Sequence, residues 1–423
     1  MPEKNKTFTL HEDWTVVLLG FLIIFVMLFG YRMTAPAANW NNTTELLTKV
    51  LTLKNLGLFL IQFVFVLLVA AMGAILAGKS MKDIVPGFTV IYLLTMIALI
   101  IAGNAGIRGL NLEAVIISLT IGLLIRNLMK VPVWLQNALS TELYVKIGLV
   151  LLGTGIIFGD ILKAGTLGLI QALLVVVSVW YFAFWLCKKL KIDDELGLML
   201  SSAVSICGVS AAIATSGAIK GDSKKLSYVI SLVLITAIPM MIFMPYIAIW
   251  LGLSQEVTGA WLGGTIDTTG AVVASGTLVG ETALKISTIV KFSQNVLLGI
   301  AAFAISVYWT YTRRTNIEGV DKKPTLAVIW ERFPKFVLGF IVASLLFSFI
   351  IDPVLAGEVK GSLKNLQTLW FTLAFTSIGL ETKFSDLFKQ NNRKPLYAFL
   401  LAQTFNILIT LVIAYFLFGK VWG

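Results

Sequence analysis

Long apolar runs separated by short polar stretches dominate the pattern of this chain. Most runs have about 17 to 25 residues, which is enough for a helix to cross a hydrocarbon core. Because lipid offers no hydrogen-bond partners, each run must satisfy its own backbone polar groups, so the runs predict helices. The longest polar connectors, 32–55 and 312–333, are too short for a separate soluble domain. The runs occupy residues 14–31, 56–77, 86–103, 111–128, 144–162, 167–187, 197–219, 226–252, 259–279, 284–311, 334–351, 365–380 and 395–418.

Composition supports this interpretation. Hydrophobic residues make up 58% of the 423 residues and charged residues only 13%, whereas soluble domains carry about 25% charged residues. The net charge is +11, but Lys and Arg lie between apolar runs, which is typical of membrane topology rather than of nucleic-acid binding. The sequence therefore predicts an all-α polytopic membrane protein that contacts the lipid bilayer and no nucleic acid.

Histidine and cysteine are scarce. The single histidine, His11, lies in the N-terminal tail, and Cys187 and Cys207 lie in apolar runs. No Cys/His set remains for a metal, and no histidine lies in the membrane for acid–base catalysis. We expect no enzymatic activity, no catalytic residues, no metal and no cofactor.

Two runs, 197–219 and 259–279, are rich in Gly, Ser and Thr at their centres. Small residues allow close helix–helix packing in membranes, which is one interpretation. The interpretation we favour is that each segment is broken or re-entrant, because transporters place broken helices at their binding sites. With two re-entrant hairpins the chain crosses the membrane eleven times, and with two broken crossing helices it crosses thirteen times.

These two segments also align with each other. Residues 216–217 fall on 275–276, and 221–222 fall on 280–281. A second aligned pair places Gly153, Phe158, Asp160 and Lys163 on Gly379, Phe384, Asp386 and Lys389. Inverted repeats are common in secondary transporters. We therefore predict additional N-terminal helices at 1–110 and a transporter core of two repeats at 111–423.

The distribution of Lys and Arg predicts the orientation. Re-entrant hairpins place Lys220, Lys224 and Lys225 on the N-terminal side, which increases the positive bias of that side. The N-terminus is then cytoplasmic and the C-terminus outside.

Asp267 and Lys291 are the candidate charged residues of a site, because ionisable groups at membrane depth are costly. Lys291 would attract an anion, and either residue would couple transport to an ion. Alternatively, Lys291 snorkels towards water and Asp267 forms a structural ion pair or a helix cap. The first repeat has no charged counterpart of either residue. Neutral candidates for substrate binding are Ser205, Gly208, Ser210, Thr265, Thr268, Thr269, Ser275 and Asn295, joined by exposed N–H groups if the backbone is unwound.

Four motifs carry a resemblance to a known family. They lie at 205–211, 265–276, 288–291 and 377–382. With these motifs the chain resembles the bacterial YeiH-type proteins, which are named as sulfate exporters of the inner membrane. This chain departs from that family at Ile266, where the family has His, and at Gln294 and Asn295, where it has a positive charge.

Residues 147–245 are also similar in layout to the bile-acid/sodium symporter superfamily. The resemblance implies an elevator-like motion and a homodimer. Together these observations predict a secondary transporter of a small anion (sulfate or sulfite, a sulfonate or a carboxylate), coupled to H⁺ or Na⁺. An anion channel is the alternative.

Overall fold

The computed structural model describes residues 11–30, 32–79, 81–109, 114–312, 330, 333–384 and 393–419. These residues form helices and connecting loops, and the only bridge between extended residues among them joins Trp40 and Asn104. Asp386 and Lys389 of the second aligned pair lie outside the described residues. Six described helices are long and apolar enough to cross a membrane: α3 (Leu53–Leu76), α4 (Met81–Ala102), α9 (Phe158–Lys189), α12 (Ser223–Trp250), α15 (Glu281–Thr312) and α19 (Lys394–Phe418). The expected all-α polytopic membrane fold is confirmed.

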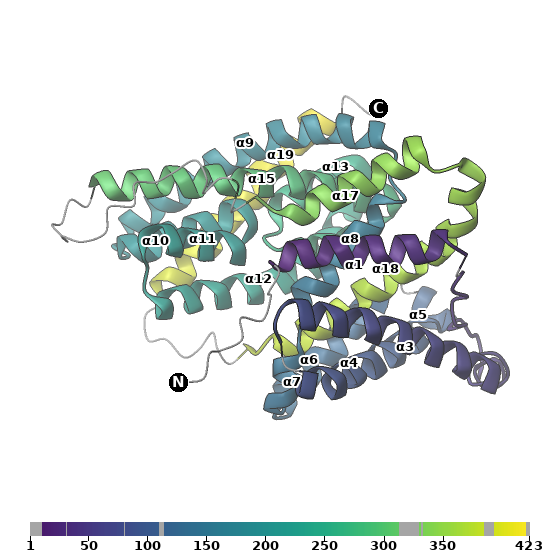
Figure 1. Ribbon diagram of the computed structural model, residues 1–423. Coiled ribbons are helices and arrows are strands. Elements are labelled where there is room, and N and C mark those ends of the chain that lie inside the picture. Colours follow the sequence, from purple (N-terminus) through teal and green to yellow (C-terminus); the bar gives the residue numbers. More distant parts are fainter. Residues whose placement is uncertain are drawn as a thin grey trace, which may run out of the picture. The chain divides into compact units, whose positions relative to one another are not determined.

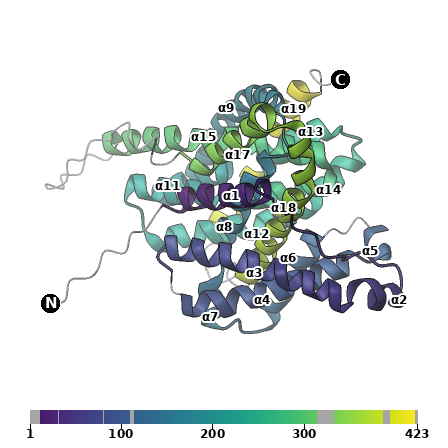
Figure 2. The same ribbon diagram turned by 45° about the vertical axis from the view of Figure 1, so that its right-hand side comes forward.

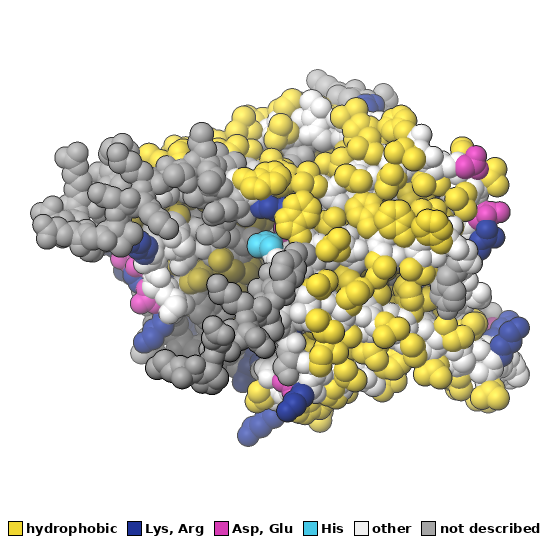
Figure 3. All heavy atoms as spheres, viewed as in Figure 1, with side chains coloured by type: hydrophobic (Ala, Val, Ile, Leu, Met, Phe, Trp, Pro, Cys, Tyr) yellow, Lys and Arg dark blue, Asp and Glu magenta, His cyan; other side chains and the backbone are white. Residues whose placement is uncertain are grey.

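Hydrophobic side chains cover much of the described surface on the face that Figure 3 shows. Leu68 of α3 and Tyr181 of α9 are 64% and 66% exposed. Side chains of this kind would be costly in water, and they are suited to contact with lipid.

Most of the remaining apolar runs form shorter helices. These are α1 (Glu12–Leu28), α6 (Ala114–Leu128), α8 (Thr141–Gly153), and α17 (Lys335–Leu345) with its π-helical extension η3 (Leu346–Ile350). Three short elements join them: α2 (Thr43–Glu45) with η1 (Leu46–Val50), α5 (Ala105–Gly109) and α7 (Val133–Ala138).

Two predicted boundaries were wrong. The run expected at 144–162 is divided, because α8 ends at Gly153 and α9 begins at Phe158, whose N–H donates to Ser348 Oγ (3.0 Å). The run expected at 365–380 belongs to a longer helix, α18 (Pro353–Glu381). It starts earlier because the Asp352 carboxylate caps its first turn.

The chain divides into two compact units. Unit 1 comprises residues 1–158 and 335–383, and unit 2 comprises residues 159–334 and 384–423. This division does not coincide with the boundary expected at residue 110, because α6 and α8 pack against α17 and α18.

In unit 1, α6, α8, α4 and α1 pack against α18. The helix α18 crosses α6 so closely that a Cβ on Gly379 would lie 2.5 Å from Leu119 O. Trp370 of α18 packs on Tyr144 of α8 with ring centroids 5.7 Å apart, and Thr376 shares a 2.7 Å hydrogen bond with Thr95 of α4. The helix α4 also packs against α3 and α7 (Figures 1 and 2).

In unit 2, each small-residue segment folds as a hairpin. Hairpin 1 consists of α10 (Asp194–Ser202), the π-helical turn η2 (Ala203–Cys207) and α11 (Val209–Ile219), and hairpin 2 consists of α13 (Gln255–Thr265) and α14 (Thr269–Val279). Each hairpin is followed by one long helix, α12 or α15.

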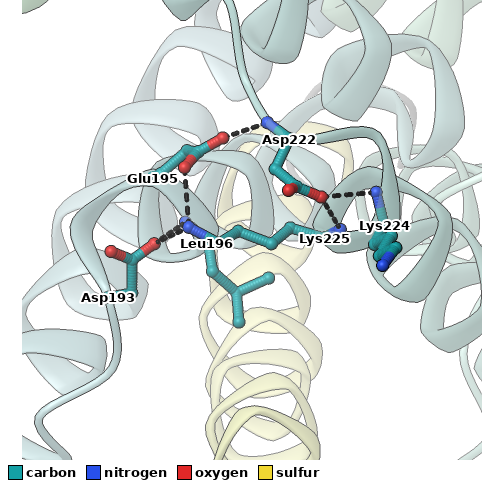
Figure 4. Close-up of polar contacts among 6 residues, drawn as sticks. All are labelled: Asp193, Glu195, Leu196, Asp222, Lys224 and Lys225. Carbon is teal, nitrogen blue, oxygen red and sulfur yellow. Dashed lines mark hydrogen bonds and ion pairs between the residues drawn. The ribbon is translucent and has the colours of Figure 1, made fainter.

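The ends of hairpin 1 meet at its base. Asp222, after the end of α11, donates its N–H to the Glu195 carboxylate at the start of α10. Lys225 extends between Asp193 and Glu195 and lies 2.6 Å from each carboxylate (Figure 4). Because the segment returns to the point where it began, it is re-entrant and does not cross.

Hairpin 2 closes in the same way. Gln255, the first residue of α13, accepts a hydrogen bond from the N–H of Ala283 in α15 (3.4 Å). Its side chain also lies within 3 Å of the place where a Cβ on Gly280 would be. The alternative of two broken crossing helices is therefore wrong for both segments.

The helix α12 connects the base of hairpin 1 to the base of hairpin 2. Its 28 residues span about 42 Å at about 1.5 Å per residue, more than a hydrocarbon core of about 30 Å. The two hairpins therefore open towards opposite ends of α12, and they form the inverted pair that the sequence repeat predicts.

Candidate functional site

The tips of the two hairpins meet within unit 2. Gly208 has φ +63° and ψ −110°, a conformation that only glycine adopts readily. A Cβ on Gly208 would lie 3.1 Å from the Cβ of Asp267. In hairpin 2 the break is the extended backbone at Ile266 and Thr268, on either side of Asp267.

Both tips bring helix ends of opposite polarity together. The first half of each hairpin ends at the tip, where its last carbonyl groups have no partner within the helix, and the second half begins there with free N–H groups. The start of α11 has no side-chain cap, whereas Thr268 Oγ1 caps α14 by accepting from the Ala271 N–H (3.4 Å).

Side chains from α15 and α19 satisfy the carbonyl groups at the end of η2. Asn406 Nδ2 donates to Val204 O (3.1 Å), Gln294 Nε2 donates to Ser205 O (2.9 Å), and Lys291 Nζ donates to Ile206 O (2.7 Å). Three consecutive carbonyls thus each receive one buried donor. These carbonyls lie in the π-helical turn at the end of the first half of hairpin 1, where the last carbonyl groups have no partner within the helix.

Two of these amides also bind the other hairpin. Gln294 Nε2 donates to Gly264 O (3.2 Å), and Asn406 Nδ2 donates to Thr265 O (3.2 Å). Thr265 O accepts a second bond, from Gln403 Nε2 (3.1 Å). The hairpin tips are therefore held together by a shared set of amide donors.

Lys291 lies deep in the unit and does not snorkel. Its side chain is 1% exposed, and the ammonium donates to Ile206 O and to Gln294 Oε1 (2.8 Å). The hypothesis that Lys291 reaches towards water is wrong. Ser287, Gln294 and Asn295 are buried on the same helix.

Asp267 is 1% exposed, and its Oδ2 atom has no hydrogen-bond partner. The Gln403 amide lies beside the carboxyl group. Within the part of the chain that the structure describes, neither Asp267 nor Lys291 makes an ion pair. The alternative that Asp267 forms a structural ion pair is therefore wrong among the described residues.

The neutral candidates take different positions. Thr265 and Asn295 are buried, and each leaves one side-chain oxygen unpaired. Thr269 accepts a hydrogen bond from Asn295 Nδ2 (3.3 Å). The hydroxyl groups of Ser205 and Ser275 donate to carbonyls of their own helices, and Ser210 is exposed on α11.

Sequence reasoning did not find the polar face of α19. Gln403, Asn406 and Thr410 are buried, and Thr410 Oγ1 donates to Asn406 Oδ1 (2.8 Å). Their spacing of three and four residues places them on one helix face. This spacing is the sequence signal that would have found them. Gln171 of α9, which donates to Ala260 O (2.7 Å), was missed in the same way.

Comparison with known proteins gives the family. A family model described as "Conserved hypothetical protein 698" matches residues 86–398. The chain belongs to this family, whose members are named UPF0324 membrane proteins. The family is thus one of multi-pass membrane proteins. No solved structure matches the chain.

Three relatives are bacterial membrane proteins. A UPF0324 membrane protein of Rhodopirellula baltica is 40% identical over 382 residues, which cover 87% of this chain and 68% of that protein. One from Nitratidesulfovibrio vulgaris is 38% identical, with 82% of this chain and 62% of that protein covered. The chain therefore spans about two thirds of the length of these two relatives. One from Nitrosomonas europaea is 28% identical, with 92% and 91% covered.

Proposed function

We propose that this protein is a secondary active transporter of a small anion and that the anion binds where the hairpin tips meet. The observation that carries the proposal is the Lys291 ammonium, which is buried without a contacting carboxylate beside the uncapped start of α11. Helix N-termini and buried cations both favour anions. The site thus combines a full positive charge with free backbone donors.

The solute classes that suit such a site are oxyanions such as sulfate or sulfite, sulfonates and carboxylates. Each presents several oxygens to N–H donors and a negative charge to the ammonium. The motifs shared with the YeiH-type sulfate exporters favour the same classes. The site residues would be Gly208, Thr265, Thr269, Lys291 and Asn295, with Asp267 coupling transport to H⁺ or Na⁺.

The inverted hairpins favour alternating access over a channel, because a channel needs a continuous polar lining. In this proposal an elevator-like movement carries the hairpin tips, with the bound anion, from one side of the membrane to the other. The protein lies in the bacterial inner membrane with its N-terminus in the cytoplasm, its C-terminus outside and a second copy as partner. It catalyses no reaction and needs no cofactor beyond the coupling ion.

The test is a thermal-shift screen of the purified chain with small anions, because a ligand that binds only the folded state raises its apparent stability. Lys291→Gln removes the charge and keeps a donor for Ile206 O. Lys285→Gln on the same helix is the matched control, because Lys285 pairs with Glu281 (3.5 Å) away from the tips.

We expect an anion to stabilise the wild type and the control but not Lys291→Gln. If the shift persists in Lys291→Gln, the lysine does not bind the anion. Uptake of the labelled stabilising anion into proteoliposomes should saturate as its concentration rises. Unlabelled anion should exchange with the labelled anion. Flux that rises linearly with concentration would instead indicate a channel.

A further inference from the structure

The charges at the hairpin tips balance one another. Lys291 contributes one positive charge and Asp267 one negative charge, and both are fully buried. Each half-helix end contributes roughly half a charge. Two N-terminal ends, of α11 and α14, meet two C-terminal ends, of η2 and α13, so the four partial charges cancel. These groups together are therefore close to neutral when both side chains are ionised.

A neutral site in a membrane does not accept a net charge easily. Binding one anion beside ionised Asp267 would leave an uncompensated negative charge away from water, which is costly. The repulsion disappears if the carboxyl group takes up one proton. The site then carries the single positive charge of Lys291 and matches one negative charge on the solute.

The contacts of Asp267 fit this role. It precedes the cap residue of α14 and lies against Gly208, at the start of α11. The carboxylate therefore occupies the region where the two helix N-termini attract negative charge. Its Oδ2 atom is buried and unpartnered, so a proton can be added there without breaking a hydrogen bond.

The groups around Asp267 leave few other proton acceptors. Among the described residues, Lys291 of α15 is the titratable neighbour of Asp267, and the Cys207 thiol of η2 is in turn a neighbour of Lys291. The helix α19 contributes the amides of Gln403 and Asn406, and α12 contributes the apolar side chain of Val233. Amides, apolar groups and a neutral thiol take up no proton, and Lys291 is already protonated when both side chains are ionised, so Asp267 is the group whose protonation compensates a bound anion.

We propose that Asp267 is the resident counter-ion of the site and that each solute anion binds together with one proton on its carboxyl group. This inference rests on the proposed function and defines it further. The solute carries one negative charge, as a sulfonate or a carboxylate does, and transport is electroneutral symport with H⁺ rather than with Na⁺. In each binding event, the Asp267 carboxylate takes up one proton and becomes a carboxylic acid, and one monoanion binds beside it.

The test is calorimetric titration of the purified full chain with acetate, methanesulfonate and sulfate between pH 5.5 and 8.5. Two buffers that differ in ionisation enthalpy are used at each pH, so that proton uptake appears as a difference in heat. For wild type we expect the monoanions to bind with uptake of one proton, and their Kd to rise about tenfold per pH unit above the titration of Asp267.

Asp267→Asn mimics the protonated acid. We expect it to bind the same monoanions with no proton uptake and with a Kd independent of pH. Asp222→Asn is the matched control, because Asp222 lies at the base of hairpin 1, and it should behave like wild type. If Asp267→Asn does not fold, proton uptake by the wild type decides alone.

Several results would overturn the inference. Binding of a monoanion to wild type without proton uptake, preference for sulfate, or a requirement for Na⁺ would each refute it and leave the proposed function intact. Binding of zwitterionic taurine in place of the anions, or of no anion to either protein at any pH, would refute the proposed function itself.

Discussion

Asn406 of α19 holds the two hairpin tips together, and its replacement by leucine should weaken unit 2 strongly. Leucine has a similar size but no donor or acceptor. The substitution removes the bonds from Nδ2 to Val204 O and to Thr265 O, and the bond that Thr410 Oγ1 donates to Oδ1. Thr265 O retains the bond from Gln403, so Val204 O and the Thr410 hydroxyl lose these partners.

The expected cost follows from the number of bonds. Side-chain hydrogen bonds in membrane proteins contribute about 0.6 kcal/mol on average and at most about 1.7 kcal/mol. Loss of three such bonds therefore lowers the free energy of unfolding by about 2–5 kcal/mol. The leucine side chain does not recover this, because it replaces the amide inside a polar cluster.

The assay is reversible unfolding in mixed micelles, followed by circular dichroism. Thr404→Val is the matched control, because Thr404 is exposed on the same helix and donates only to Leu400 O. It should change the unfolding free energy by less than about 0.5 kcal/mol. A loss below about 0.5 kcal/mol for Asn406→Leu would refute the view that this amide ties the tips together.

A double-mutant cycle sharpens the test. Gln403 and Asn406 both donate to Thr265 O, so either single substitution leaves one donor in place. The double variant removes both donors, and its cost should exceed the sum of the single costs by about 1–2 kcal/mol. Simple additivity would show that Thr265 O is satisfied in another way.

Three further predictions concern glycine positions and one cap. Gly208→Ala should cost at least about 1 kcal/mol more unfolding free energy than Gly252→Ala, because both residues have positive φ but only Gly208 lacks space for a Cβ; equal costs would show that backbone strain alone matters. Gly379→Ala should cost about 1–3 kcal/mol by overpacking, whereas Gly361→Ala on the same helix has open space and should be neutral or stabilising in the same assay. Backbone N–H groups of α12 lower the pKa of Asp222, so its cap contribution is present above about pH 4 and is lost as the pH falls further. Amide hydrogen exchange at the start of α12 should therefore differ between wild type and Asp222→Ala at pH 6, and the difference should narrow as the pH falls below 4; a difference that does not narrow would contradict this.

The apolar runs predicted most helices because the requirement to satisfy backbone groups in lipid is local. Runs 197–219 and 259–279 also showed where the fold departs from simple crossing helices. The composition of these runs does not predict that each segment turns back as a hairpin, since a broken crossing helix has the same composition. This reversal depends on long-range contacts at the hairpin bases, such as the bond from the Asp222 N–H to Glu195.

The candidate site was predicted where charge made it conspicuous. Asp267 and Lys291 stand out because ionisable groups are rare at membrane depth. Gln403 and Asn406 do not stand out in an apolar run, and their importance appears only when the carbonyl groups of both tips are placed beside them. Which residues satisfy a broken backbone is a property of the packing between helices, and one helix alone does not reveal it.

The two repeats share an architecture but differ in charge at the tip, and the geometry gives a reason. In the register that aligns residue 216 with 275, Gly208 corresponds to Asp267. These two residues lie against each other where the hairpin tips meet. A carboxylate in both copies would place two like charges side by side, and one of them would have to be protonated. A Cβ at position 208 would also lie 2.6 Å from Val233 Cγ1. Glycine in one copy thus makes room for the aspartate of the other, so that the repeated fold holds one carboxyl group rather than two.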